Sequence, residues 1–188
     1  MPSLSIPRPG PDEAAPFYHG YIAKVAGENI LEQLVNQLAE VERLFGALDD
    51  TAALARYSPG KWSVKEVQGH LTDVERIFSY RLLRISRGDV TPLPGFDENT
   101  FVSAARFDER PLRDLASEFR AVRLSSVALG NGLPPTSWSQ MGHASGNPVS
   151  ARALVYIMVG HVAHHLGVLR ERYGIGARAA SAPFAENR

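Results

Sequence analysis

The sequence contains no cysteine, and its charges cancel, with 20 lysines and arginines against 20 aspartates and glutamates in 188 residues. Without cysteine, the chain has no disulfide, no thiolate nucleophile and no cysteine-ligated zinc site of its own. A net charge of zero gives no overall electrostatic attraction to nucleic acid, so we expect no nucleic-acid partner, although a local basic patch stays open as an alternative. A thiol reaction here would need a thiol carried by a small molecule.

The sequence also lacks a long apolar segment near its start. Five prolines fall within residues 1–16, a density that prevents regular structure and is unlike a signal peptide or a membrane span. We therefore expect residues 1–20 to form an extended N-terminal arm, and we expect a cytoplasmic protein with no membrane partner. A composition of 44% apolar and 21% charged residues suits one globular domain.

Helical periodicity dominates the remaining chain, and strand-like alternation is nearly absent. Apolar residues recur at three- and four-residue steps, which is typical of helices with one face in a core. The second such stretch follows the capping box Ser63-x-x-Glu66, which marks where its first turn begins. The expected helices cover residues 28–48, 64–86, 98–105, 111–129 and 149–173.

Four long helices joined by two long connections predict one all-α domain, a four-helix bundle, over residues 21–176. Gly174 and Gly176 end the last helix, so we expect residues 177–188 to form a flexible C-terminal tail. Bundles of this kind commonly hold metal ions between facing helices.

Histidines on two of these helices have the spacing of metal ligands. His161 and His165 are four residues apart and share one helical face, where neutral imidazoles can bind a divalent metal. His70 lies in the inward apolar stripe of the second long helix. If these helices are neighbours, three imidazoles converge and leave an open position for water or a thiol. We expect His164 to face a neighbouring helix.

Core histidines that are hydrogen-bonded to backbone or carboxylate groups are the other interpretation. Three unpaired imidazoles buried together would be costly, so the pattern favours a metal. Asp73, one turn after His70, could orient that ring or accept a proton, or it could lie on a solvated face. A solvated face is expected for Glu75. Arg81, also on the apolar stripe, could anchor an anionic substrate or pair with a carboxylate at position 73, 75 or 97.

Four ordered segments resemble the DinB-like superfamily, most closely its YfiT-type branch of metal-dependent hydrolases. They are Tyr57–Val67, His70–Arg76, Thr91–Asp97 and Gly160–His165, and the likeness covers most of residues 20–173. The resemblance implies an up-up-down-down bundle that binds zinc or nickel through His70, His161 and His165. It also implies a homodimer and a kinship with bacillithiol-dependent transferases and a mycothiol-dependent isomerase.

The sequence therefore predicts an enzyme whose metal activates water or a low-molecular-weight thiol against a small electrophilic substrate. Such an enzyme would be a hydrolase or a thiol S-transferase, with Asp73 and Arg81 as candidate catalytic residues. Two alternatives stay open. One is a non-catalytic module, either a metal-stabilised dimer or a small-molecule sensor, and the other is a bundle whose histidines bind no metal.

Overall fold

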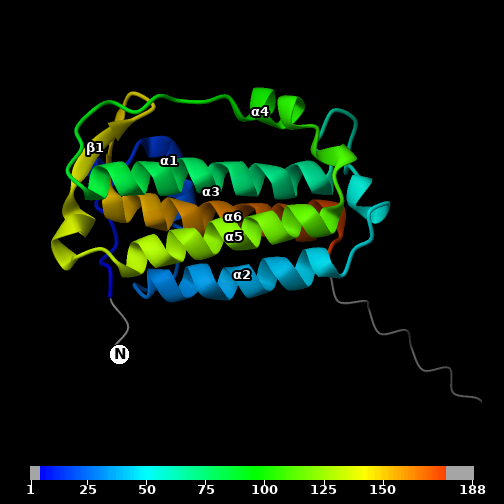
Figure 1. The fold of residues 1–188 in the computed structure, drawn as a ribbon, viewed down its shortest axis with the longest axis horizontal. Coiled ribbons are helices and arrows are strands. Elements are labelled where there is room, and N and C mark those ends of the chain that lie inside the picture. The colour runs from blue at the N-terminus through cyan, green and yellow to red at the C-terminus, as the bar shows by residue number, and fades with distance from the viewer. Residues whose placement is uncertain (1–4, 177–188) are drawn as a thin grey trace, which may run out of the picture.

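The computed structural model describes residues 5–176, in which four long helices pack side by side (Figure 1). α2 (Ile30–Gly46) and α6 (Ala151–Tyr173) run in one direction, and α3 (Val64–Ser86) and α5 (Leu112–Asn131) run in the other. The order around the bundle is α6, α2, α5, α3, since each packs on the next. Read around this ring, the helices have the predicted up-up-down-down arrangement, while along the chain the order is up, down, down, up. The four-helix bundle is confirmed.

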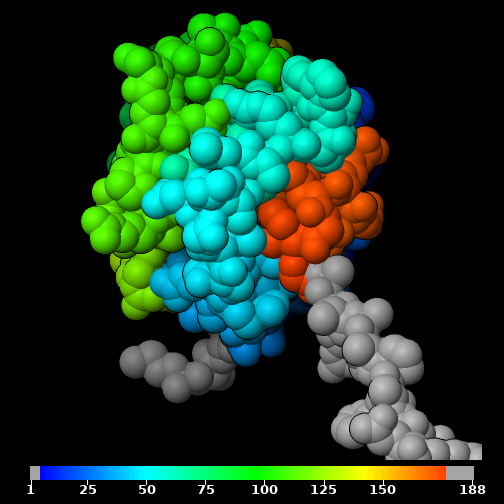
Figure 2. All heavy atoms as spheres, turned by 90° about the vertical axis from the view of Figure 1, so that its right-hand side faces the viewer, coloured from blue at the N-terminus to red at the C-terminus, as the bar shows by residue number. Residues whose placement is uncertain are grey.

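Shorter elements cover the ends and one side of the bundle. Figure 2 shows one end, where the α2–α3 connection in cyan lies beside the last turns of α6 in orange. The predicted tail at residues 177–188 lies outside the described residues. The shorter elements are η1 (Pro11–Glu13), α1 (Pro16–Ile22), η2 (Ala52–Leu54), α4 (Glu98–Ala105), η3 (Phe107–Glu109), η4 (Pro135–Ser139), β1 (Met141–Ala144) and β2 (Asn147–Ser150).

The start of the chain differs from the expected extended arm. Residues 16–22 form helix α1, because proline suits the first turn of a helix and Pro16 occupies that position. α1 packs on α6 at Gly160, where an added Cβ would lie 2.0 Å from the Tyr21 carbonyl oxygen. The lack of a side chain at Gly160 thus permits the close contact between the two helices.

The connection before α6 also differs from the expected loop, because β1 and β2 form an antiparallel hairpin within it. Both residues of its two-residue turn, Ser145 and Gly146, have positive φ, as a type I′ turn requires. The hairpin continues into Ser150, so α6 begins at Ala151 rather than at Val149. Ser150 caps α6 by accepting a 3.0 Å hydrogen bond from the Ala153 amide.

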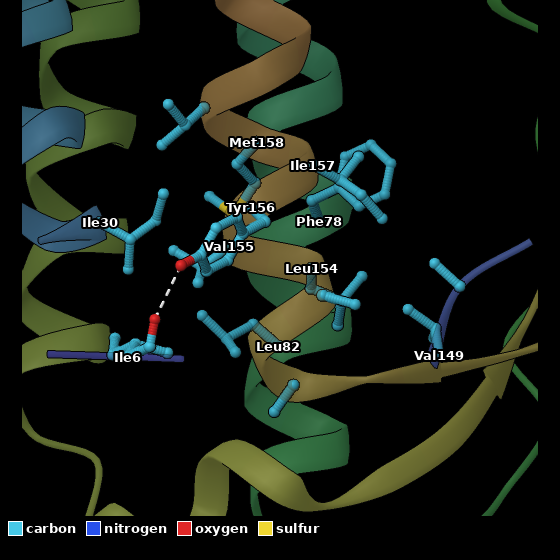
Figure 3. Close-up of a cluster of buried hydrophobic side chains, with 14 of the residues drawn as sticks. Ile6, Ile30, Phe78, Leu82, Val149, Leu154, Val155, Tyr156, Ile157 and Met158 are labelled. Carbon is cyan, nitrogen blue, oxygen red and sulfur yellow. Dashed lines mark hydrogen bonds between the residues drawn. The ribbon is translucent and has the colours of Figure 1, made fainter. Parts of the chain in front are cut away.

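Two apolar clusters fill the bundle and meet along α6. The first surrounds its N-terminal half, where Tyr156 donates a 2.7 Å hydrogen bond to the carbonyl of buried Ile6 (Figure 3). The second surrounds its C-terminal half and includes Leu166 and Leu169. α6 is long and apolar enough to cross a membrane, but 67% of its most apolar window is buried inside the bundle. The apolar character of α6 is therefore that of a core helix.

Candidate metal centre

The N-terminus of α3 sets the position of His70. The predicted capping box is present: Ser63 Oγ accepts from the Glu66 amide at 3.0 Å, and the Glu66 carboxylate accepts from the Ser63 amide at 2.7 Å. These bonds satisfy amides that a helix start leaves free, so the first turn is fixed. His70 follows on the face that packs against α6.

Three imidazoles meet between α3 and α6. His70 Nε2 lies 3.0 Å from His161 Nε2, and the His165 ring centroid lies 4.9 Å from that of His70 and 4.6 Å from that of His161. One nitrogen from each ring lies within 4.8 Å of the others. His70 and His161 are buried, and His165 is partly buried. The expected convergence of the three side chains is thus present.

The donor set fits a divalent metal. Zinc binds imidazole nitrogen at about 2.0–2.1 Å, so two nitrogens of one tetrahedral site lie about 3.3 Å apart. The 3.0 Å separation of the His70 and His161 nitrogens is close to that value. In the described residues no carboxylate or other histidine joins this group. Three protein ligands would leave a coordination position open.

Burial keeps the three rings in the form that binds metals. It lowers the pKa of His70 to about 4 and that of His165 to about 3. It also lowers the pKa of His161 well below its ordinary value, and the neighbouring histidines add to this effect. All three rings are therefore neutral at pH 7, with a nitrogen lone pair available for a metal.

A cavity of about 300 Å³ opens onto the histidines and has mostly aromatic walls. The Trp62 ring centroid lies 4.7 Å from that of His70, and the Tyr21 centroid lies 5.5 Å from that of His161. Apolar walls with a few polar groups are typical of small-molecule sites. The cavity is lined by Phe17, Tyr18, Tyr21, Trp62, His70, Val74, Phe78, Phe96, Glu98, Ser145, His161, His164 and His165.

Several of these wall residues had no functional role in the sequence-based prediction. Two examples are Tyr21, which comes from helix α1, and Trp62, which directly precedes the N-cap residue of α3. For Tyr21, the sequence feature that could have indicated a role is the cluster of aromatic residues at 17–21. His164, expected to face a neighbouring helix, lines the cavity outside the three-histidine group, and burial lowers its pKa.

Asp73 does not line the cavity. Its nearest cation is Arg76, with a nitrogen–oxygen distance of 3.8 Å, and the other charges that influence it are Glu118 and Arg110 on the side of α5. Burial raises the pKa of Asp73. The structure therefore does not bring this candidate catalytic residue to the three histidines.

Arg81 is buried, with 2% of its surface exposed, and it pairs with none of the three carboxylates that the sequence offered. Its Nη2 donates to the Pro94 carbonyl at 2.8 Å and to Ser145 Oγ at 2.9 Å. Glu75, expected on a solvated face, is instead buried and forms an ion pair with Arg123 at 2.8 Å. The solvated-face prediction for Glu75 was wrong.

Comparisons with known proteins agree with this architecture. The DinB superfamily matches residues 33–169 of the chain. YfiT from Bacillus subtilis, described as a probable metal-dependent hydrolase with an unusual four-helix bundle topology, has a TM-score of 0.63 at 16% identity. That alignment covers 89% of this chain and 93% of YfiT.

Two further solved structures share the fold. The mycothiol-dependent maleylpyruvate isomerase has a TM-score of 0.66 at 14% identity, over 83% of this chain and 64% of the isomerase. A DinB-like protein from Bacillus cereus has a TM-score of 0.57 at 18% identity, over 79% of this chain and 93% of that protein. No curated protein matches the sequence. Because the family match spans more than half of the residues, this chain belongs to the DinB superfamily.

Proposed function

We propose that this protein is a metal-dependent enzyme that acts on a small electrophilic molecule, with His70, His161 and His165 as ligands of zinc or nickel. The observation that carries the proposal is the set of three neutral imidazoles at a cavity with aromatic walls. A divalent ion bound there would supply Lewis-acid chemistry, lowering the pKa of a water molecule or of a low-molecular-weight thiol.

The side chains around the histidines would position the substrate and handle protons. Tyr21 and Trp62 present ring surfaces that would exclude water and contact an apolar substrate. His164 lines the same cavity, and its lowered pKa leaves it neutral at pH 7 and able to accept a proton. We assign it the role of general base in place of Asp73, which lies outside the cavity.

Both nucleophiles have support. YfiT is described as a probable hydrolase, whereas the isomerase depends on mycothiol. A chain without cysteine would take its thiol from a cosubstrate. The family resemblance further leads us to propose a cytoplasmic location and a homodimer. A mass measurement of the purified protein in solution would test the homodimer.

The test supplies zinc- or nickel-loaded protein with monochlorobimane and, in turn, each low-molecular-weight thiol. We expect thiol conjugation that depends on the metal and is lost in His161→Asn. The matched control is His143→Asn, because His143 is exposed on β1 and lies outside the cavity. Conjugation that is equal in metal-free protein and in both variants would refute the proposed role of the site.

Metal binding without turnover of any thiol or ester substrate would have a different meaning. It would retain the three-histidine site but favour the non-catalytic alternative, a metal-dependent sensor or a metal-stabilised dimer.

A further inference from the structure

Arg81 lies on the same face of α3 as His70. The two residues are eleven positions apart, or about 16 Å along the helix axis. Eleven positions make three full turns plus about 20° of rotation, so both side chains leave the helix in nearly the same direction. Long side chains on a helix lean toward its N-terminus, so the guanidinium points back toward the histidines. Its central carbon lies 5.3 Å from the Phe78 ring centroid and 5.8 Å from that of Phe96. Both rings line the histidine cavity.

The surroundings of Arg81 hold the guanidinium in place without neutralising its charge. Its hydrogen bonds go to two uncharged oxygens, the Pro94 carbonyl and Ser145 Oγ. Among residues 5–176, no carboxylate lies within ion-pair distance of Arg81, and Asp73 and Glu75 pair elsewhere. Aromatic faces offset part of the cost of burying a cation, but a buried charge without a counter-charge remains unfavourable. An anion would relieve that cost.

Space for such an anion exists beside Arg81. Arg81 and Phe96 border a second, mainly apolar cavity of about 310 Å³, and Phe96 also lines the histidine cavity. The other cation of this second lining, Arg76, pairs with Glu118 at 2.7 Å. One uncompensated positive charge matches a group with one negative charge, so the chemistry fits a carboxylate better than a dianionic phosphate.

The lining of the histidine cavity includes one carboxylate, that of Glu98. After burial, the Glu98 carboxylate is the next cause of the raised pKa of Tyr21. An anionic group of a ligand would be repelled by Glu98 and attracted by Arg81, which borders the second cavity. The two charges therefore favour a ligand whose anionic group lies at Arg81, beside Phe78 and Phe96.

We propose that Arg81 is the specificity-determining residue of this site and binds a carboxylate of the substrate or thiol cosubstrate. The carboxylate would lie about 10 Å from the reacting atom, roughly two helical turns, with an apolar segment between them. Only the assignment of the reacting end rests on the proposed function.

Metal-free protein tests this role directly. Trp62 lines the cavity, so tryptophan fluorescence can follow titrations with 4-phenylbutyrate and with its uncharged analogue 4-phenylbutanol. We expect at least a tenfold tighter binding of the carboxylate to the wild type. Arg81→Met should abolish that preference while leaving the affinity for the alcohol unchanged, and Arg81→Lys should retain part of it.

Arg84→Met is the matched control, since Arg84 is one turn onward, lies outside both cavities and pairs with Asp89. It should keep the full preference. Equal affinity of the wild type for the two ligands, or an unchanged preference in Arg81→Met, would overturn the proposal. If Arg81→Met does not fold, the comparison of the wild type with Arg81→Lys decides. A preference for the carboxylate over the alcohol that is as strong in Arg81→Lys as in the wild type would overturn the assignment.

An arginine that only ties α3 to Pro94 and Ser145 would change stability in these variants but would not separate the acid from the alcohol. Because the titrations need no metal, failure of the proposed function would leave their result unchanged. Conversely, metal content in His161→Asn reports on the metal site alone. The two proposals can therefore fail independently.

Discussion

His70 couples the candidate site to the stability of the protein. In the unfolded chain it binds a proton below about pH 6.5, whereas in the folded, metal-free protein burial lowers its pKa to about 4. Acidification from pH 7 to pH 5 therefore protonates the unfolded state first. Through this residue alone, the unfolding free energy of the protein should then fall by about 2 kcal/mol.

Urea unfolding of metal-free protein at pH 7, 6 and 5 would measure this effect. Stability should fall more steeply with acidification in the wild type than in His70→Gln, which has no titrating group at this position. Identical pH slopes for the two proteins would contradict the buried, neutral state of His70.

Residue spacing predicts the histidines but not the charged residues around them. His161 and His165 share a face because one helix fixes their separation, and the apolar stripe of α3 directs His70 inward. Asp73 is about 60° around α3 from His70, which suffices to turn it toward α5. Glu75 and Arg123 are 48 residues apart, so their ion pair follows from the packing of α3 on α5 and leaves no local pattern.

Helix α1 forms one wall of the cavity, and its contact with α6 depends on Gly160. A Cβ at this position would lie 2.0 Å from the Tyr21 carbonyl oxygen, so Gly160→Ala must displace α1. We expect a loss of about 1–3 kcal/mol of unfolding free energy, typical of overpacking. Amide hydrogen exchange in residues 16–22 should accelerate, and ligand binding in the cavity should weaken.

Gly167→Ala on the same helix is the control, because nothing lies within 4 Å of a Cβ added there. It should leave exchange in α1 unchanged and can stabilise α6, since alanine favours helices by up to about 1 kcal/mol over glycine. Equal effects of the two substitutions would show that the α1 contact does not depend on Gly160.

The long helices could be predicted to within a few residues, whereas α1 and the β1–β2 hairpin could not. Periodicity over several turns and the Ser63 capping box are strong local signals. α1 has only seven residues and begins at Pro16, so its stability comes from packing on α6. The hairpin strands have four residues each and include Pro148, which hides the alternation of a strand.

At the scale of the whole molecule, two apolar clusters extend along the bundle, so we expect it to fold without a metal. Chelation with EDTA should therefore leave the helical circular dichroism signal unchanged. Metal present at 100 times its Kd adds about 2.7 kcal/mol of stability, so its removal should lower the Tm by roughly 5–10 °C. Loss of helicity on chelation would instead indicate a metal-dependent fold.

Both the proposed reaction and the proposed metal chemistry depend on the claim that three histidines from two helices bind one divalent ion. Metal content per chain, measured by mass spectrometry of the untagged protein dialysed against zinc or nickel, tests it most directly. We predict about one ion per chain in the wild type and in His164→Ala, and a loss of bound metal in His70→Ala, His161→Ala and His165→Ala. Unchanged metal content in these three variants, or no bound metal in the wild type, would contradict the account.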